Sequence, residues 1–247
     1  IISQLQTGKT RTTTLVVAAS TATDDEKIGA DYICDGTADN VELQAAHDAL
    51  STNGGSIYLS SGLFILSSTV TISKNISLIG SGPVITRITQ RTPNINAITI
   101  GNGISDYTEG LYLSNFRIGT VPGAGNAVFL NRVHRSIFTN METYGAGNAA
   151  WSLAGCLGNT FINITPAGAN IPFTNDGETA ASYTYCFYLS RIPNSISCNA
   201  NTFIGCNAEG GNYGYYFADQ NSEGNNIIEG GICEAQTVYG IYASNII

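Results

Sequence analysis

The chain has 247 residues, a formal net charge of −8 and only 11% charged residues. This length is ordinary for one all-β domain with a single core. The sequence has no stripe of basic residues that could neutralise phosphates, so we expect neither nucleic acid nor an anionic membrane as a partner. We expect the ligand to be neutral and not anionic.

The sequence also lacks the patterns of a membrane span and of a metal site. No run reaches the roughly 18 to 20 apolar residues of a span, so no membrane insertion is expected. The six cysteines form no C-x-x-C pair and have no flanking histidines at ligand spacing, which argues against zinc. We therefore expect no metal and no cofactor, and most cysteines to be small buried hydrophobic residues.

The first part of the chain is expected to cap a larger structure. Residues 1–27 are expected to form an N-terminal arm or linker, and residues 28–73 an entry module with a short capping helix. The sequence Asp39-Asn-Val-Glu42 resembles a capping box, and apolar side chains follow on one helix face as far as Leu50. Such a helix would plug the open end of a solenoid.

From residue 74 to 247, short strand-like runs recur, which indicates a solenoid. Aligning them places one turn residue per coil in a column, at intervals of 25, 23, 42 and 25 residues. The column holds Asn115, Asn140, Asn163, Gly205 and Gly230. Asn and Gly tolerate the left-handed backbone needed where a strand bends sharply, and stacked Asn side chains can hydrogen-bond along the column.

Two apolar columns flank this bend and are expected to point inward. The column before the bend holds Leu113, Phe138, Phe161, Phe203 and Ile228, and the column after it holds Phe116, Met141, Ile164, Cys206 and Gly231. A second family of runs, such as Cys186-Phe-Tyr-Leu189, adds at least one further strand per coil. The prediction is an all-β, right-handed parallel β-helix. The alternative, a β-sandwich, would not keep these columns in register over five segments.

The entry region resembles a known fold family. The motifs are Ala30-Asp-Tyr-Ile-Cys-Asp-Gly-Thr-Ala-Asp39, Gly54-Gly55-Ser-Ile-Tyr-Leu59, Gly62-Leu-Phe and Asn75-Ile-Ser-Leu-Ile-Gly-Ser-Gly82. Together they resemble the entry module of the pectate-lyase-like right-handed β-helix superfamily, in particular its bacteriophage tailspike type. The resemblance implies an extracellular or virion-surface location, a carbohydrate substrate and often a homotrimer.

The sequence departs from the enzymes of this superfamily. It has neither the aspartate cluster that pectate lyases use for calcium nor the Gly-His-Gly and Asn-Thr-Asp elements of the polygalacturonase type. Its histidines, His47 and His134, fall on the entry helix and between coils and are expected to be structural or surface residues. The resemblance therefore carries over no catalytic residue, because one fold hosts many functions.

An aromatic ladder is the first candidate binding feature. It consists of Phe129, Trp151, Tyr188, Tyr216 and Tyr242, each between two inward neighbours in the second family of runs. Strand alternation turns these rings outward on one face, where they could stack on sugar rings with the help of the nearby Tyr213. They could equally be buried against sister subunits of a homotrimer.

Glu209 and Glu234 form the candidate catalytic pair. Each lies four residues past its bend residue, Gly205 or Gly230, so the two should stack on adjacent coils and face outward. Strands about 4.8 Å apart would bring the carboxylates near the ~5 to 5.5 Å separation of a retaining glycosidase. Like charges that close push one pKa up. A solvated pair of surface glutamates is the alternative.

Two further charged features accompany the pair. Arg117 and Glu142 stack two positions past the bend and are expected to form an exposed ion pair of little energetic weight. The 42-residue interval leaves an insertion over residues 165–185, expected to be a loop on the side of the solenoid. Asp176 and Glu178 in this loop could join a sugar groove, or the loop could be a subunit contact.

The sequence is compatible with two functions. The first is a tailspike-like protein, secreted or on a virion, that binds a polysaccharide and depolymerises it as a glycoside hydrolase or, alternatively, as a polysaccharide lyase. The second is a non-catalytic structural or adhesive β-helix in which the aromatic ladder joins protomers.

Overall fold

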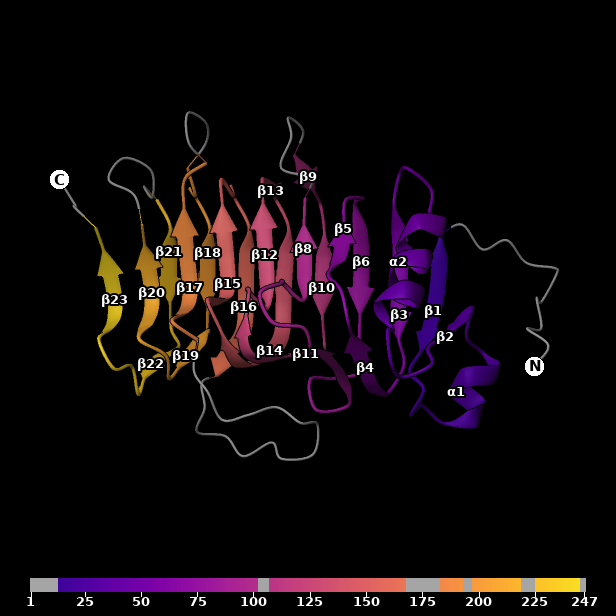
Figure 1. Cartoon of the computed structure of the whole chain (residues 1–247). Helices are drawn as coiled ribbons and strands as arrows, with labels where there is room; N and C mark the ends of the chain where they lie inside the picture. Colours follow the sequence, from indigo (N-terminus) through magenta and orange to yellow (C-terminus); the bar gives the residue numbers. More distant parts are fainter. Residues whose placement is uncertain (1–12, 102–106, 168–182, 193–196, 219–224, 245–247) are drawn as a thin grey trace.

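The computed structural model describes residues 13–101, 107–167, 183–192, 197–218 and 225–244. The chain winds into an elongated stack of parallel strands, with the helices at the N-terminal end and β23 (Tyr239–Ala243) at the other (Figure 1). The predicted right-handed parallel β-helix is confirmed.

One sheet combines two faces of each coil, which meet at the bend. The strands that pair before the bend are β3 (Gly55–Leu59), β6 (Ile76–Ile79), β10 (Tyr112–Ser114), β18 (Thr202–Ile204) and β21 (Ile227–Glu229). Those after it are β4 (Gly62–Leu66), β7 (Thr86–Gln90), β11 (Arg117–Ala124), β19 (Asn207–Glu209) and β22 (Ile232–Glu234). Two long strands, β14 (Ile137–Gly147) and β16 (Thr160–Ala167), run through the bend and belong to both faces.

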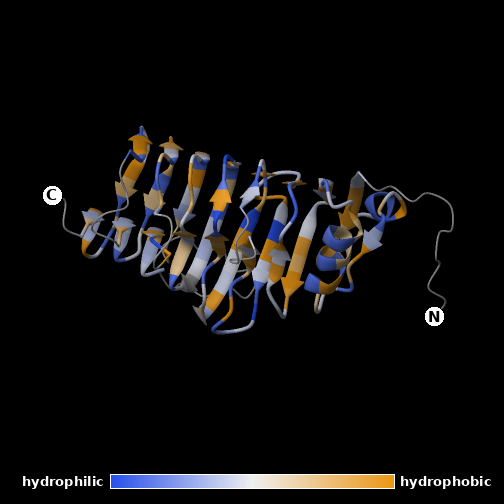
Figure 2. Cartoon of the chain, turned by 90° about the horizontal axis from the view of Figure 1, so that it is seen from above, coloured by the Kyte–Doolittle hydropathy of each residue, from blue (hydrophilic) through white to orange (hydrophobic). Residues whose placement is uncertain are grey.

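The third face is a seven-stranded sheet that closes each coil. It contains β5 (Val70–Ile72), β8 (Ile98–Ile100), β12 (Val128–Asn131), β15 (Ala149–Ala154), β17 (Tyr185–Ser190), β20 (Tyr213–Phe217) and β23. A short pair, β9 (Thr108–Glu109) and β13 (Val133–His134), lies in the connections between coils. Apolar and polar residues alternate along the strands (Figure 2), as expected where one strand face lines a core.

The bend column forms as predicted. Asn115, Asn140 and Asn163 have φ angles of 62°, 52° and 50°, and Gly205 and Gly230 have 60° and 64°. The Asn140 side-chain amide donates a 2.6 Å hydrogen bond to the Asn115 side-chain oxygen. The left-handed backbone at this column turns each strand into the next face, so the bend sets the cross-section of the whole solenoid.

The predicted column before the bend packs as a stack of rings in the core. Phe138 lies 4.9 Å from Phe161, and Phe161 lies 4.7 Å from Phe203, with ring centroids as the reference points and nearly parallel planes. All three side chains are fully buried. Parallel pairing without a shift in register places each ring on its counterpart, so one position in the repeat makes one continuous core column.

A second asparagine column lies inside the protein, at the turn that opens each run. Asn159 and Asn201 are fully buried. The Asn159 amide donates to the Asn201 side-chain oxygen at 2.9 Å, and the Asn201 amide donates to Asn226 at 3.0 Å. Each side-chain oxygen also accepts a backbone N–H from the preceding coil, as from Ser136 and Asn159. These bonds satisfy polar groups that would otherwise be buried at a cost.

The N-terminal region differs from the sequence expectation. Residues 1–27 were expected to be an arm or linker, but β1 (Thr14–Ala18) pairs with β3 and with β2 (Tyr32–Ile33), and α1 (Asp24–Ile28) follows β1. Side chains of β1 that face the core, such as Val17, are apolar and buried. The stacked strands therefore begin with β1, earlier in the chain than the repeats indicated.

The predicted capping helix is present as α2 (Asn40–Ala49), but its predicted capping box is not formed. The Asp39 carboxylate accepts backbone N–H groups of Gly36 and Ile65, both at 2.7 Å, instead of an N–H of the helix. Asp39 thus ties the helix start to β4. A capping box does form at α1, where Thr23 and Glu26 exchange hydrogen bonds, and this one was missed.

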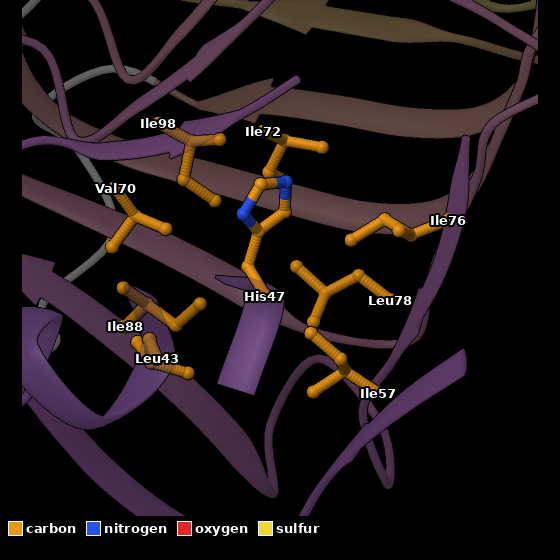
Figure 3. Close-up of a pocket in the computed structure, with 9 residues that line it drawn as sticks. All are labelled: Leu43, His47, Ile57, Val70, Ile72, Ile76, Leu78, Ile88 and Ile98. Carbon is orange, nitrogen blue, oxygen red and sulfur yellow. The ribbon is translucent and has the colours of Figure 1, made fainter. Parts of the chain in front are cut away.

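Helix α2 closes the core over a small apolar cavity of about 10 Å³, into which the His47 ring points (Figure 3). A cavity of this size is at the limit for one water molecule and cannot hold a sugar. The His47 ring is 2% exposed and accepts the backbone N–H of Ser73 at Nε2, while its Nδ1 lies 2.8 Å from Asp48. His47 is therefore a structural link between the helix and β5.

Glu26 joins α1 to the start of β4. Its carboxylate accepts the backbone N–H of Ser61 at 2.9 Å, the Ser61 hydroxyl at 2.7 Å and the backbone N–H of Thr23 at 3.0 Å. These bonds, led by that of the Ser61 N–H, lower the pKa of Glu26 from 4.5 to about 2. Because the folded-state pKa is depressed, the stabilisation is present above pH 4.5 and is lost as the pH falls towards 2.

We predict that Glu26→Gln lowers the free energy of unfolding at pH 7 by about 1 kcal/mol, less than is usual for charged hydrogen bonds because the side chain is partly exposed. The difference from the wild type should shrink between pH 4.5 and 2. Urea unfolding at several pH values measures it, with Asp25→Asn in the same helix turn as control. An equal effect of both variants would contradict the assignment.

Candidate functional site

Two columns of tyrosine lie on the outer face of β17, β20 and β23. Tyr185, Tyr213 and Tyr239 are Cα partners on these three strands, and so are Tyr188, Tyr216 and Tyr242. Together these six residues form what we call the tyrosine platform. Tyr239 is 53% exposed, and the other five side chains are partly buried. The predicted outward ladder is present at Tyr188, Tyr216 and Tyr242.

The two columns share one face because each strand carries an irregularity. Tyr185 and Tyr188 are three residues apart and would lie on opposite faces of a regular strand. The two residues between them, Cys186 and Phe187, are both buried, so the strand departs from regular alternation at this point. Gly214 and Tyr215 repeat this pattern in the next coil.

The platform is one continuous layer of rings. Along the columns, ring centroids lie 5.3 Å apart for Tyr185 and Tyr213, and 4.8 Å apart for Tyr216 and Tyr242. Across the columns, the distance is 4.8 Å for Tyr185 and Tyr216 and 4.9 Å for Tyr213 and Tyr216. Burial by neighbouring rings raises the pKa of Tyr216, so its hydroxyl is neutral near pH 7. Such a layer offers large amphipathic area with hydroxyl groups at its surface.

Trp151 is not part of this face, so its predicted outward position is wrong. Its Cα partners are Val128 and Phe187 of the inward column, and its side chain is fully buried. The ring packs edge-on against Phe138 at 5.4 Å and Phe161 at 5.6 Å. The reason is register: Ala149 pairs with Tyr185, so Trp151 pairs with Phe187, one position away from the alignment that the sequence suggested.

Ser152 occupies the ladder position that was assigned to Trp151. It is the Cα partner of Phe129 on one side and of Tyr188 on the other, and it is 5% exposed. The aromatic ladder is therefore interrupted there, and the continuous platform begins at β17. The sequence search missed Tyr185 and Tyr239, although each shares a column with Tyr213 and this spacing was visible in the sequence.

Glu209 and Glu234 end β19 and β22 and are Cα partners on adjacent coils, as their spacing indicated. Glu209 is partly buried, while Glu234 is exposed. Burial raises the pKa of Glu209, and the charges of Glu234 and Glu142 add to the rise. Glu234 lies in the last described coil, where the neighbouring side chains are also exposed.

Arg117 and Glu142 pair as predicted, but the pair is not exposed. The Arg117 side chain is 2% exposed, and its Nε and a terminal guanidinium nitrogen both lie 3.2 Å from one Glu142 carboxylate oxygen. The Tyr144 ring covers the guanidinium at 4.7 Å and its hydroxyl donates to Glu142 at 3.0 Å. Tyr144 therefore covers Arg117 while the Glu142 side chain stays 27% exposed, and the two-residue spacing alone did not reveal this burial of the guanidinium.

The carboxylates and the platform lie on two faces that meet at one corner. Strand β19 ends at Glu209, and β20 begins at Tyr213, with Gly210, Gly211 and Asn212 between them. In the preceding coil, Ala167 is the Cα partner of Glu209. The insertion was expected over residues 165–185, but residues 165–167 belong to β16 and Tyr185 begins β17. Asp176 and Glu178 of that insertion lie outside the described residues.

Cys34, Asp39 and Glu42 bring three potential metal-ligand atoms within 4.8 Å of one another. Both Asp39 oxygens already accept the backbone N–H groups of Gly36 and Ile65. Burial raises the pKa of Asp39 and of Glu42, which weakens both as anionic ligands. Asp39 at the start of α2 thus links segments of the entry module, and α2 lies at the opposite end of the solenoid from β23 of the tyrosine platform (Figure 1).

The remaining titratable candidates are structural. His134 is 6% exposed and stacks on Tyr107 with ring centroids 3.7 Å apart, and burial lowers its pKa. Five of the six cysteines are buried, as expected, and Cys233 in the last described coil is exposed. In the part of the chain that the structure describes, neither helix is long and apolar enough to cross a membrane.

Comparisons with known proteins support the fold. No protein-family profile and no curated protein sequence matches the chain. Among solved structures, the chain resembles ORF18 of Geobacillus virus E2, with a TM-score of 0.60 and 17% identity over 85% of this chain and 48% of that one. The chain thus spans about half the length of the virus protein.

Two weaker likenesses concern the A-module of mannuronan C-5 epimerase AlgE6 from Azotobacter vinelandii and a pectin methylesterase from Aspergillus niger. The TM-scores are 0.34 and 0.36, and the identities 14% and 11%. The epimerase match covers 82% of this chain and 72% of that one, and the esterase match 94% and 91%. The class of this protein, the parallel β-helix, is defined by its own strand pairing.

Proposed function

We propose that this chain binds a polysaccharide on the tyrosine platform and hydrolyses it with Glu209 and Glu234. The observation that carries the proposal is the platform itself: six tyrosines from three successive coils form one continuous outer layer beside a carboxylate pair. Aromatic rings bind the apolar faces of sugar rings while phenol hydroxyls remain available for hydrogen bonds. Because the tyrosines recur in each coil, the platform can contact successive sugar units of a polymer.

The charge of the site favours a neutral polysaccharide. Glu209 and Glu234 lie on one outer face, and the whole chain carries a net charge of −8. A polymer of uronic acids would meet like charge at this face, whereas a neutral polymer would not. We therefore propose a neutral polysaccharide as the ligand class.

The spacing of the carboxylates fits hydrolysis with retention. Partner residues on parallel strands are about 4.8 Å apart, close to the roughly 5 to 5.5 Å between the carboxyl groups of retaining glycosidases. One glutamate would act as acid, and the other as nucleophile or base. Lyase chemistry is the alternative. A lyase would produce unsaturated sugar ends, which absorb ultraviolet light, whereas a hydrolase would produce new reducing ends without this absorbance.

The proposed location is extracellular or on a virion, with a tailspike-like role. Support comes from the resemblance of the entry region to tailspike entry modules and from the fold that the chain shares with a Geobacillus virus protein. Both concern the fold, so the role rests on the binding experiment below.

We predict that Tyr216→Ala weakens polysaccharide binding roughly tenfold, about 1.4 kcal/mol, because Tyr216 contacts both columns of the platform. Affinity electrophoresis against a panel of capsular and cell-wall polysaccharides measures it. Tyr58→Ala is the matched control, since Tyr58 is a 44% exposed tyrosine on β3 at the other end of the solenoid. Equal binding by both variants would remove the platform as the site.

We predict that Glu209→Gln and Glu234→Gln each lower turnover by several orders of magnitude while binding is retained, because both groups would act on the scissile bond. Reducing-end assays measure turnover, and circular dichroism checks the fold. Glu229→Gln is the control, because Glu229 is an exposed glutamate on β21 of the other face. Full activity of both Gln variants would show that the pair is not the catalytic site.

A non-catalytic homotrimer held together by the platform is the second candidate function, favoured by the exposure of an aromatic layer. We expect light scattering to show a homotrimer that Tyr216→Ala leaves intact, because the platform is free for sugar in our proposal. Dissociation of the trimer by Tyr216→Ala would place the platform in the subunit interface and favour the second function.

A further inference from the structure

We propose that Asn212 is a sugar-binding residue at the corner between the carboxylate pair and the tyrosine platform. Its side-chain amide donates hydrogen bonds to hydroxyl oxygens of the bound polysaccharide. This inference rests on the proposed function and deepens it, because it names the group that recognises the ligand between two parts of the site that lie on different faces.

The corner is the only connection between these two parts within one coil. Strand β19 ends at Glu209 and β20 begins at Tyr213, and Gly210, Gly211 and Asn212 lie between them. A polysaccharide that stacks on Tyr213 and also reaches Glu209 must pass over this corner. Of the three corner residues, Asn212 alone has a side chain that can form hydrogen bonds with it.

The two glycines give the corner its shape. Gly210 and Gly211 have φ angles of 72° and 78°, the left-handed backbone that glycine adopts without strain. A Cβ atom at Gly211 would lie 2.9 Å from the carbonyl oxygen of Tyr183 in the preceding coil, so no larger residue fits there. Neither glycine therefore places a side chain between Glu209 and Asn212.

The backbone of Asn212 is held by both neighbouring coils. Its N–H donates to the carbonyl oxygen of Thr184 in the preceding coil at 3.1 Å. Its carbonyl oxygen accepts the N–H groups of Val238 and Tyr239 in the following coil at 3.0 and 3.1 Å. The position of Asn212 is thus fixed by the stack before any ligand binds.

The side chain of Asn212 is fixed as well, in an orientation that leaves its donors free. Its Oδ1 accepts a hydrogen bond from the Thr237 hydroxyl at 2.8 Å, while the residue is exposed to solvent. Among the residues that the structure describes, Nδ2 of Asn212 has no acceptor. Its two N–H groups are therefore available to a ligand, and a donor that is already oriented loses little entropy on binding.

This geometry indicates what the corner recognises. An uncharged amide donor suits the hydroxyl oxygens of a neutral sugar, and its bond is directional, whereas ring stacking on Tyr213 depends mainly on contact area. A site that donates to a particular hydroxyl discriminates against a sugar that lacks it. Asn212 thus contributes selectivity to a platform that supplies area.

The first test is Asn212→Asp, which keeps the shape of the side chain and an acceptor for Thr237 but has no N–H donor. We expect polysaccharide binding about fivefold weaker, the effect of one hydrogen bond, and a similar loss in Asn212→Ala. Affinity electrophoresis with the polysaccharide that the wild type binds measures it. Asn53→Asp is the matched control, because Asn53 is an exposed asparagine in the turn between α2 and β3, at the other end of the solenoid (Figure 1).

The second test concerns Thr237 as a positioning residue. Thr237→Val keeps the amide donors but frees the side chain of Asn212, and we expect binding about twofold weaker. In the Asn212→Ala background the same substitution should cause no further loss, because Thr237 acts through Asn212. With a hydrolysed polysaccharide, Asn212→Ala should raise KM and leave kcat unchanged, as expected when binding alone is lost. Circular dichroism checks the fold of each variant.

The outcomes separate this inference from the proposed function. Wild-type affinity in both Asn212→Asp and Asn212→Ala overturns the inference, and the platform remains the binding site if Tyr216→Ala still binds weakly. Wild-type affinity in Asn212→Asp alone also overturns it, because the amide would then not act as a donor. A full additional loss from Thr237→Val in the Asn212→Ala background contradicts the positioning of Asn212 by Thr237. The absence of polysaccharide binding by the wild type overturns the proposed function itself.

Discussion

The structure depends on one constraint, the parallel stacking of coils in register. Each residue faces the residue at the same position of the next coil, about 4.8 Å away. Phe138 therefore lies on Phe161, Asn140 on Asn115, and Tyr216 on Tyr188. The stacking turns any preference at a single repeat position into a continuous column, in the core or on the surface.

This constraint favours some side chains and disfavours others. Aromatic rings and amides gain from facing their own kind, because rings stack and amides are both donors and acceptors. Charged side chains lose energy when they face a side chain of the same charge. The favourable arrangement is a pair of opposite charges, such as Arg117 facing Glu142. Glu209 facing Glu234 is unfavourable for folding, and burial together with the charge of Glu234 raises the pKa of Glu209.

The same constraint leaves an N-terminal end that must be closed by other means. Helix α2 covers the core there, and Asp39, Glu26 and His47 connect the helices to strands β4 and β5. Charged and polar side chains thus supply at this end the backbone partners that a further coil supplies elsewhere. The aromatic and acidic surface lies at the other end of the described structure (Figure 1), away from these structural contacts.

The sequence by itself determined the features that follow from strict periodicity. The Asn and Gly bend column, the inward Phe column and the register of Glu209 with Glu234 were all correct, because a residue's place in a stacked repeat depends only on its distance from the bend. Fold class followed for the same reason.

Tertiary structure decided what depends on local irregularity or on distant contacts. Trp151 faces inward because the interval between the bend and the third face differs by one residue between coils, so Ser152 and not Trp151 is the partner of Tyr188. Two consecutive inward residues, Cys186 and Phe187, bring Tyr185 and Tyr188 to one face and so create the platform. Arg117 is buried because Tyr144 folds over it, and Asp39 binds Ile65 across the coil instead of its own helix. These contacts are set by packing between segments far apart in sequence, where periodicity carries no information.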